Sequence, residues 1–198
     1  MEEYSSPTPQ GRLTAEMLDE LLKLGAEAWR EFSTSADARF HRFIPANGAL
    51  AHAALLDLGA HAHSFLELGS GAGVITILAD LMGFDASGIE IEPELIELAH
   101  GLAERFDSRA TFVQGSFVPP DYRDEIQSLD GDFLTLTEGA DGYEELGLEI
   151  ADFDMVYAYP WPGEQEWMVE LVRRHAGQRT QMLMYNVSEG FELVGLAD

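Results

Sequence analysis

Residues 65–73 read Phe65-Leu66-Glu67-Leu68-Gly69-Ser70-Gly71-Ala72-Gly73, and this stretch decides the fold of the 198-residue chain. A short apolar run carrying one acidic residue leads into three glycines at alternate positions, and residues 72–82 continue apolar on nearly all sides. The first part suits a buried strand, and the last part suits a helix packed against a sheet. We therefore expect a strand at 64–68, a glycine turn and a helix at 72–82.

The glycine turn predicts a close-fitting, negatively charged ligand group. Glycine takes positive φ readily and lets a ligand approach the backbone, while the start of the following helix offers free N–H groups. A dinucleotide fingerprint would need its third glycine at position 74, where this chain has Val74. The spacing therefore disfavours an NAD-dependent oxidoreductase or a flavin enzyme.

A second strand-and-helix unit follows. Residues 86–91 read as a strand with Glu90 near its end, and Pro93 suits the first turn of a helix over 93–106. A carboxylate at this place in a doubly wound fold can accept hydrogen bonds from both hydroxyls of a ribose.

These two units resemble the first two motifs of the class I S-adenosylmethionine-dependent methyltransferases. The resemblance rests on the acidic-x-Gly-x-Gly-x-Gly run at 67–73 and on Gly-Ile-Glu-Ile-Glu-Pro at 88–93. It implies S-adenosyl-L-methionine as the cofactor, with Glu90 on the ribose and Ile91 against the adenine. The residues implied at the methionine end are Glu67, Gly69, Ser70, Gly71 and Gly73.

A third strand, 110–114, runs into Gly115, Ser116 and Phe117. In the family an acidic side chain commonly follows this strand and receives the adenine amino group, and here Ser116 stands in its place. Ser116 or a backbone carbonyl could accept instead. Phe117 could face the purine, with ordinary core packing as the alternative.

The fourth strand, 154–159, ends in Tyr159-Pro160-Trp161-Pro162. Ligands of open α/β sheets sit beyond the carboxyl ends of the strands, so this string should border the transferred methyl group. It partly resembles the pattern of amino-group methyltransferases, without their acid or amide. The candidate catalytic residues are Tyr159, to orient or deprotonate the acceptor, and Trp161, to hold a cation against its ring. The alternative is an aromatic turn packed under the sheet.

The expected fold is α/β, a doubly wound, Rossmann-like and mostly parallel sheet. Its order is 3-2-1-4-5, with a fifth strand at 180–185, a helix at 164–175 and an abbreviated C-terminal edge to which 191–194 add at most one short strand. Two N-terminal helices precede it, at 14–32 and from the N-cap Asn47 to Leu58. We expect a disordered tail at 1–13, a helical cap at 14–62 and a methyltransferase-like domain at 63–198. The domain carries a turn-rich insertion at 118–152, with turns at Asp130-Gly131 and Asp141-Gly142.

Acidic residues dominate the composition. Eleven Lys and Arg against 36 Asp and Glu give a net charge of −25, which repels polyanions and disfavours a nucleic acid substrate. The acceptor is therefore expected to be a small molecule or a protein side chain. Lys23 is the only lysine, which fits either a high-salt cytoplasm or a genome rich in arginine codons.

Other site classes find little support. The chain has no cysteine, which excludes disulfides and thiolate chemistry, and His61 and His63 lack a third ligand for a metal. The start of the chain has no basic flank or apolar centre, and no apolar run has membrane-spanning length. We expect a cytoplasmic protein without a membrane partner, and the oligomeric state stays open.

Two functions remain from the sequence. The first is an S-adenosylmethionine-dependent methyltransferase with an unknown acceptor. The second is a non-catalytic module that binds S-adenosylmethionine. The glycine run and Glu90 fit both, and the Tyr-Pro-Trp-Pro string favours the enzyme.

Overall fold

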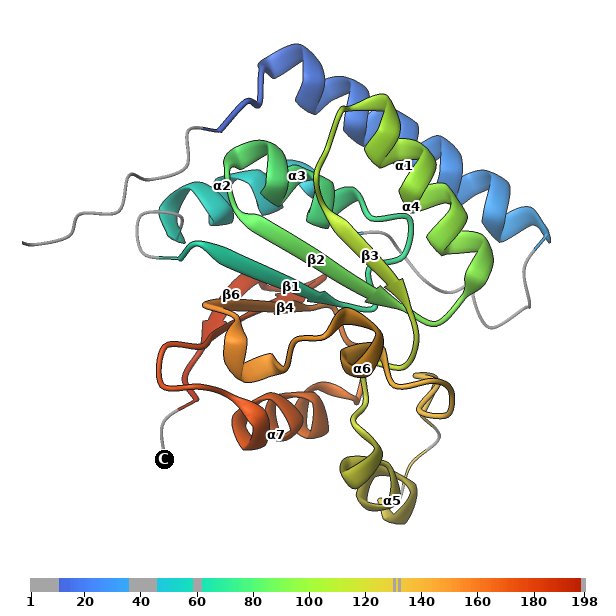
Figure 1. Ribbon diagram of the computed structural model, residues 1–198, viewed down its shortest axis with the longest axis vertical. Coiled ribbons are helices and arrows are strands. Elements are labelled where there is room, and N and C mark those ends of the chain that lie inside the picture. The colour runs from blue at the N-terminus through green and yellow to red at the C-terminus, as the bar shows by residue number, and fades with distance from the viewer. Residues whose placement is uncertain (1–10, 36–45, 59–61, 130, 132, 197–198) are drawn as a thin grey trace, which may run out of the picture.

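A six-stranded sheet forms the centre of the chain (Figure 1). The computed structural model describes residues 11–35, 46–58, 62–129, 131 and 133–196. The strand order is β3-β2-β1-β4-β5-β6, in which β6 is antiparallel to β5 and every other pair is parallel. The strands are β1 (Ser64–Leu68), β2 (Asp85–Glu90), β3 (Thr111–Gln114), β4 (Met155–Ala158), β5 (Gln181–Asn186) and β6 (Gly190–Val194). The predicted doubly wound sheet is confirmed, and β6 is its one extra edge strand.

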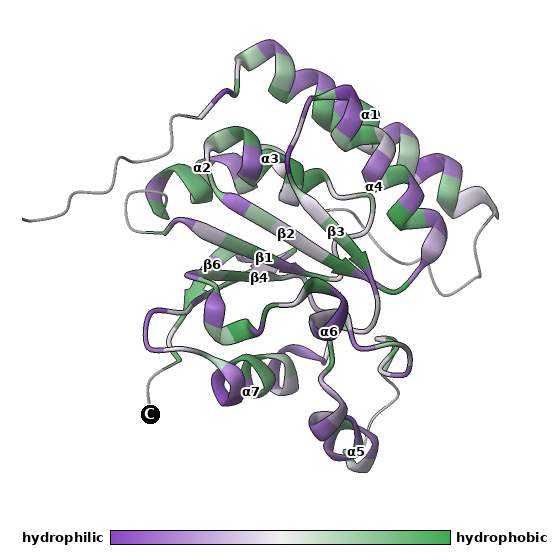
Figure 2. Cartoon of the chain, in the orientation of Figure 1, coloured by the Kyte–Doolittle hydropathy of each residue, from purple (hydrophilic) through white to green (hydrophobic). Residues whose placement is uncertain are grey.

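Helices cover both faces of this sheet. Figure 1 shows α1 (Ala15–Ser35), α2 (Gly48–Leu58), α3 (Val74–Met82) and α4 (Pro93–Arg105) on one face. The other face carries α5 (Pro120–Ser128), α6 (Gly142–Leu146), the short helix η2 (Ile150–Asp152) and α7 (Gln165–His175). Hydrophilic and hydrophobic residues alternate along α1 and α4, as expected for helices with one face on the core (Figure 2).

The side chains of β1 alternate between two hydrophobic cores. Phe65 belongs to the core under α1–α4, whereas Leu66 and Leu68 belong to the core under α7. Successive side chains of a strand point to opposite faces, so Glu67 lies on the α1–α4 face together with Phe65. This placement directs the acidic residue of the glycine motif toward the N-terminal helices.

The predicted start of α2 is right, whereas the predicted start of α3 is two residues too early. Asn47 caps α2, since its side-chain oxygen accepts hydrogen bonds from the N–H groups of Ala49 (3.1 Å) and Leu50 (3.2 Å). Helix α3 was expected from residue 72 but begins at Val74. The reason is that Gly71 and Gly73 adopt positive φ values of 55° and 75°, which lie outside the right-handed helical region.

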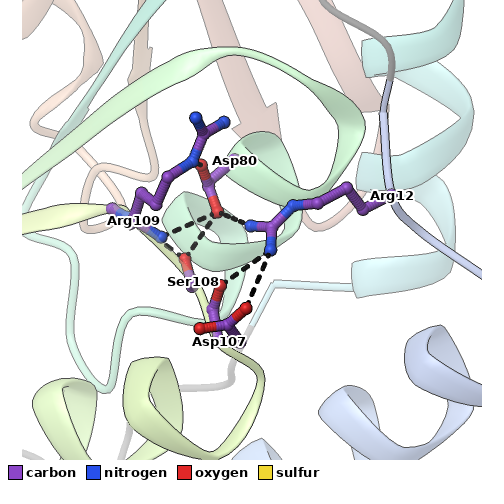
Figure 3. Close-up of polar contacts among 6 residues, drawn as sticks. Arg12, Asp80, Asp107, Ser108 and Arg109 are labelled. Carbon is purple, nitrogen blue, oxygen red and sulfur yellow. Dashed lines mark hydrogen bonds and ion pairs between the residues drawn. The ribbon is translucent and has the colours of Figure 1, made fainter.

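The last residues of the predicted tail, 11–13, contact α3. Residues 1–10 lie outside the described residues, but Arg12 and Leu13 donate backbone hydrogen bonds to the carbonyl of Leu81. The guanidinium of Arg12 also donates to Asp80 at 2.9 Å (Figure 3). Asp80, only 3% exposed, accepts further from the hydroxyl of Ser108, so these contacts hold the start of α1 on α3.

The insertion at 118–152 is more structured than its composition predicted, because it contains α5, α6 and η2. Asp141 caps α6 through a 2.9 Å bond from the N–H of Tyr143, so the expected turn at Asp141-Gly142 is wrong. Aspartate favours turns and helix caps alike, and the sequence did not separate the two. Ile150 and Tyr143 lie in the core under α7.

Some sequence-based expectations concern residues that the structure does not describe. Residues 36–45 and 59–61 of the predicted helical cap, including His61, lie outside the described residues, as does Asp130 of the predicted turn, and the division into tail, cap and domain stays a prediction. None of the helices in the described ranges has the length and apolar character needed to span a bilayer. The same residues contain no group of three or more His, Asp or Glu side chains that could hold a metal ion.

Candidate functional site

The glycine turn after β1 is held down on β2. The N–H groups of Gly69 and Ser70 donate to the carbonyl of Ile89 at 2.9 and 3.0 Å. An added Cβ at Gly71 would meet no atom within 4 Å, so this residue borders open space. The turn therefore exposes bare backbone at the carboxyl edge of the sheet.

Glu67 is a buried acid beneath this turn. Its carboxylate accepts hydrogen bonds from the backbone N–H (3.0 Å) and the hydroxyl of Thr76, on α3. Burial raises the pKa of Glu67 to about 8, and the two bonds from Thr76 oppose that rise. Tyr157 stands opposite Glu67 in the pairing of β1 with β4, so the two side chains are neighbours on the same face.

Glu90 braces the turn from the end of β2. Its Oε2 accepts from the N–H of Gly71 at 2.8 Å, and its Oε1 accepts from the N–H groups of Ile91 (2.8 Å) and Glu92 (3.0 Å). Burial raises the pKa of Glu90, while these backbone bonds lower it. Each carboxylate oxygen has about two acceptor positions. Oε1 therefore has both acceptor positions occupied, and Oε2 has one position left. Glu90 can thus accept a hydrogen bond from one ribose hydroxyl, whereas the sequence suggested that it accepts from both.

Two adjoining cavities open above these acids, and we call them together the carboxyl-edge cleft. Both are lined by Trp29, Gly69, Gly71 and Tyr159. The Glu90 side encloses about 820 Å³, including space open to solvent, and the Glu67 side about 800 Å³. Both volumes include open solvent, and the two cavities meet at the glycine turn, with Glu90 beside one and Glu67 beside the other.

The Glu67 side contains buried polar atoms without partners. The hydroxyl of Ser70 and the phenol oxygen of Tyr157 make no hydrogen bond to any described residue, although both residues line this cavity. Tyr157 is only 1% exposed, and burial raises its pKa well above the usual value for tyrosine, with Glu67 adding to the effect. A buried hydroxyl without a partner is costly, so a polar ligand group here would restore the missing bonds.

Ser116 lies in the cleft but its hydroxyl is already engaged. It donates to the carbonyl of Thr137 at 2.9 Å and accepts from the N–H of Val118 at 3.1 Å. The backbone carbonyl of Ser116 also accepts, from Gly142. Ser116 thus fixes the insertion beside the cleft, and its hydroxyl keeps at most one acceptor position for a ligand.

Tyr159 and Trp161 follow β4 and both line the Glu90 side. The ring of Tyr159 packs edge-on against Tyr185, with centroids 4.9 Å apart. Burial raises the pKa of Tyr159, and the neighbouring phenol of Tyr185 raises it further. A phenol with a raised pKa stays protonated near neutral pH, so Tyr159 suits orienting an acceptor and not deprotonating it.

The structure brings together ten of the eleven residues that the sequence singled out. The residues that line the cleft are Glu67, Gly69, Ser70, Gly71, Glu90, Ile91, Ser116, Phe117, Tyr159 and Trp161. Gly73 is absent from both linings. A Cβ on Gly73 would lie 2.5 Å from Phe112 and 2.9 Å from Ala99, so this glycine serves the packing of α4 and β3.

Other cleft residues were missed by the sequence. Trp29 belongs to no motif and falls within the predicted helix at 14–32, yet it lines both cavities. The segment 134–136 lies in the insertion, where no motif marks it, and it lines the Glu90 side. Tyr157 fits the apolar spacing of the fourth strand, and that spacing gives no information about its hydroxyl group.

Comparison with known proteins agrees with this architecture. No protein-family model matches the chain. A ribosomal protein L11 methyltransferase from Thermus thermophilus is 39% identical over 51 residues, which cover 26% of this chain and 20% of that protein. The matched segment thus spans only about a fifth of that relative's length.

Solved structures share the fold over most of the chain. An O-methyltransferase from Bacillus cereus in complex with S-adenosylhomocysteine has a TM-score of 0.54 at 16% identity, covering 89% of this chain and 69% of that one. An RNA methyltransferase from Salinibacter ruber, in complex with the same compound, has a TM-score of 0.50 at 20% identity, covering 71% and 76%. The chain therefore has the fold of S-adenosylmethionine-dependent methyltransferases.

Proposed function

We propose that this chain binds S-adenosyl-L-methionine in the carboxyl-edge cleft and transfers its methyl group to a small molecule or a protein side chain. The observation that carries the proposal is the meeting of Glu67, Glu90 and the open backbone of Gly71 at one edge of the sheet. These groups come from β1, β2 and the turn between β1 and α3, and they match the polar groups of an amino acid nucleoside.

The residues present fit this cofactor. The amino acid end would lie on the Glu67 side, where the carboxylate of Glu67 could take the ammonium group and the free hydroxyls of Ser70 and Tyr157 could donate to the carboxylate. The nucleoside would lie on the other side, with a ribose hydroxyl on the remaining position of Glu90. Ile91, Ser116 and Phe117 would surround the adenine there.

The cofactor would supply an electrophilic methyl group, and the task of the chain would be to position the acceptor and to exclude water. Trp29 and Tyr159 line both halves of the cleft, so they would flank the meeting point of cofactor and acceptor. The protonated phenol of Tyr159 would orient the acceptor atom, and Trp161 would offer a ring face to a cationic or planar group. An acceptor that reacts in its neutral form suits this set of residues.

Charge restricts the acceptor class. Neither cavity lining contains an arginine or lysine from the described residues, and the whole chain carries a net charge of −25. Phosphate groups are usually held by such cations. An acceptor with a neutral reacting atom, with or without a cationic group elsewhere, is therefore favoured over a nucleic acid, although an RNA methyltransferase shares the fold.

A non-catalytic S-adenosylmethionine-binding module is the second candidate. It is favoured by Ser116, which replaces an acidic residue and has its hydroxyl bonded within the chain. Under either function the cofactor binds. Only the enzyme transfers its methyl group.

Binding is tested by calorimetric titration of S-adenosylhomocysteine into the wild type and into Gly71→Leu. The leucine side chain would project into the open space of the cleft, so binding should be lost. The matched control is Gly147→Leu, because Gly147 has a similar φ of +70° and open space around it but lies at the end of α6, away from the cleft. Equal affinity of the two variants would refute the proposed site.

Catalysis is tested with S-adenosylmethionine labelled on the methyl group. The acceptors are a panel of amines, phenols and thiols, a set of peptides, and a structured RNA. Transfer to an amine, phenol, thiol or peptide would support the proposed acceptor class, and transfer to RNA alone would overturn it. Tight binding without transfer to any acceptor would favour the non-catalytic module.

A further inference from the structure

Glu164 joins two chain segments that are distant in sequence. Its side chain is 2% exposed. Its Oε1 accepts hydrogen bonds from the backbone N–H groups of Leu134 (2.6 Å) and Thr135 (3.2 Å), and its Oε2 accepts from the hydroxyl of Thr135. The carboxylate is thus committed to one short piece of the insertion between β3 and β4.

The backbone of Glu164 holds the opposite wall. Its N–H donates to the carbonyl of Trp161 at 2.9 Å, which closes the turn after β4, and its carbonyl accepts from Met168 at 3.2 Å in the first turn of α7. Glu164 occupies the N-cap position of α7, yet its side chain makes no capping bond. Its carboxylate instead reaches across to residues 134 and 135.

Both connected segments line the same half of the cleft. Residues Leu134, Thr135 and Leu136 face the Glu90 side from the insertion, and Trp161 faces it from the turn after β4. Leu134 and Leu136 are 39% and 37% exposed, so their own side chains hold the segment only weakly. Its two ends are anchored by Phe133, which packs beside Trp167, and by the carbonyl of Thr137, which accepts from Ser116. The bonds to Glu164 are the described polar contacts that fix its backbone.

We propose that Glu164 is a positioning residue that fixes segment 134–136 as a wall of the nucleoside half of the cleft, and thereby sets the affinity for the cofactor's nucleoside. The proposal rests on the proposed function for the identity of the ligand. The fixing of the wall itself can be measured without any ligand.

A carboxylate suits this position because it accepts from two backbone N–H groups and a hydroxyl at once, and its charge strengthens all three bonds. Glutamine keeps the size of the side chain but replaces one acceptor oxygen with an NH2 group, which cannot accept a hydrogen bond. In Glu164→Gln the NH2 group can donate to the hydroxyl of Thr135, which accepts as well as donates, but the two backbone N–H groups then bond to a neutral oxygen. Hydrogen bonds to a charged acceptor are roughly twice as strong as bonds to a neutral one, so the hold on the segment weakens. The segment should then become mobile while α7 and the core stay folded.

The first measurement is amide hydrogen exchange of Leu134 and Thr135 in the ligand-free protein. Both amides should exchange faster in Glu164→Gln than in the wild type, since their acceptor is disturbed. The matched control is Glu166→Gln, the same change on an exposed residue in the same first turn of α7, outside the cleft lining. Unchanged protection in Glu164→Gln, or equal loss in the control, would overturn the proposal.

The second measurement is the dissociation constant of two probes, S-adenosylhomocysteine and 5′-methylthioadenosine, which lacks the amino acid end. Both should bind roughly tenfold more weakly to Glu164→Gln, because only the nucleoside wall is disturbed. Thr135→Val, which keeps the shape of Thr135 but removes its hydroxyl, should weaken both probes in the same direction. The control variant Glu166→Gln should bind as the wild type does.

The outcomes separate the two proposals. Wild-type protein that binds neither probe refutes the proposed function, while the exchange result still decides whether Glu164 fixes the segment. Wild-type binding that is unchanged in Glu164→Gln refutes the role of Glu164 alone. A lower melting temperature with normal affinities would assign Glu164 a purely structural role and would also overturn the proposal.

Discussion

Glu67 shows how burial gives a single side chain an unusual proton affinity. Its pKa is raised from 4.5 to about 8 by burial, so between these pH values the folded chain holds a proton that the unfolded chain has released. The stabilising contribution of the protonated carboxyl is complete below pH 4.5 and is lost as pH rises toward 8. In Glu67→Gln the side chain is always neutral, so the free energy of unfolding of the variant, relative to the wild type, should increase across this window.

Urea denaturation of both proteins at several pH values between about 5 and 8 measures this difference. Glu97→Gln, the same change at an exposed position on α4, is the matched control. A difference that does not change with pH would mean that the carboxyl of Glu67 titrates normally. Binding of an ammonium group beside Glu67 should release its proton, which would appear as a buffer-dependent heat of titration.

At the residue scale the sequence predicted the groups that motifs mark. Glu67 was singled out by the resemblance to the methyltransferase motif, and Glu90 by that resemblance and by its place at the end of a strand in a doubly wound fold. Glu164 and Tyr157 were missed for a physical reason. Glu164 bonds to residues 29 and 30 positions earlier in the chain, and the hydroxyl of Tyr157 has no partner among the described residues. No local sequence pattern encodes either situation.

At the element scale, Asp80 anchors the N-terminal segment on α3 and joins it to the loop before β3 (Figure 3). Asp80→Ala should lower the free energy of unfolding by about 2 kcal/mol, because the hydroxyl of Ser108 and the backbone N–H of Arg109 lose their buried acceptor and Arg12 loses its partner. Arg12→Ala should cost about 1 kcal/mol, since Arg12 is partly exposed and Asp80 keeps its other partners.

Urea denaturation of the two variants gives this order directly. If Arg12→Ala cost as much as Asp80→Ala, the ion pair and not the buried hydrogen-bond network would dominate. Arg173→Ala is a suitable control, because its ion pair with Glu170 joins residues one turn apart on α7 and connects no other element.

Helices and strands whose apolar residues recur at regular spacing were predicted, and elements without such spacing were not. The strands, α1, α2 and α4 follow from apolar spacing and from the cap at Asn47. The helices of the insertion carry few apolar residues, as Figure 2 shows for α5, so their composition resembled a loop. Tyr122 and Ile126, the two buried residues of α5, attach it to the core under α7.

At the scale of the whole molecule, the net charge of −25 makes stability depend on salt. Added KCl should raise the melting temperature near neutral pH, because it screens repulsion among the acidic residues. The effect should be much smaller near pH 4.3, where the net charge approaches zero. Differential scanning fluorimetry at both pH values tests this, and an equal salt effect at both would show that self-repulsion is not the cause.

The overall topology was predictable because few arrangements join parallel strands through helices. Right-handed crossovers and a ligand site at the switch between β1 and β4 follow once the first strand-turn-helix unit is recognised. The size of the cleft was not predictable, because Trp29 and segment 134–136 come from parts of the chain outside that unit.

The placement of the three tryptophans equips the chain with built-in optical probes. The indoles of Trp29 and Trp161 border the cleft, whereas Trp167 lies in the interior beside Phe133. Intrinsic emission from the first two will respond to whatever occupies the space between them, with the third as a steady internal reference. Ligand screening can therefore proceed on the unlabelled protein before any acceptor is known.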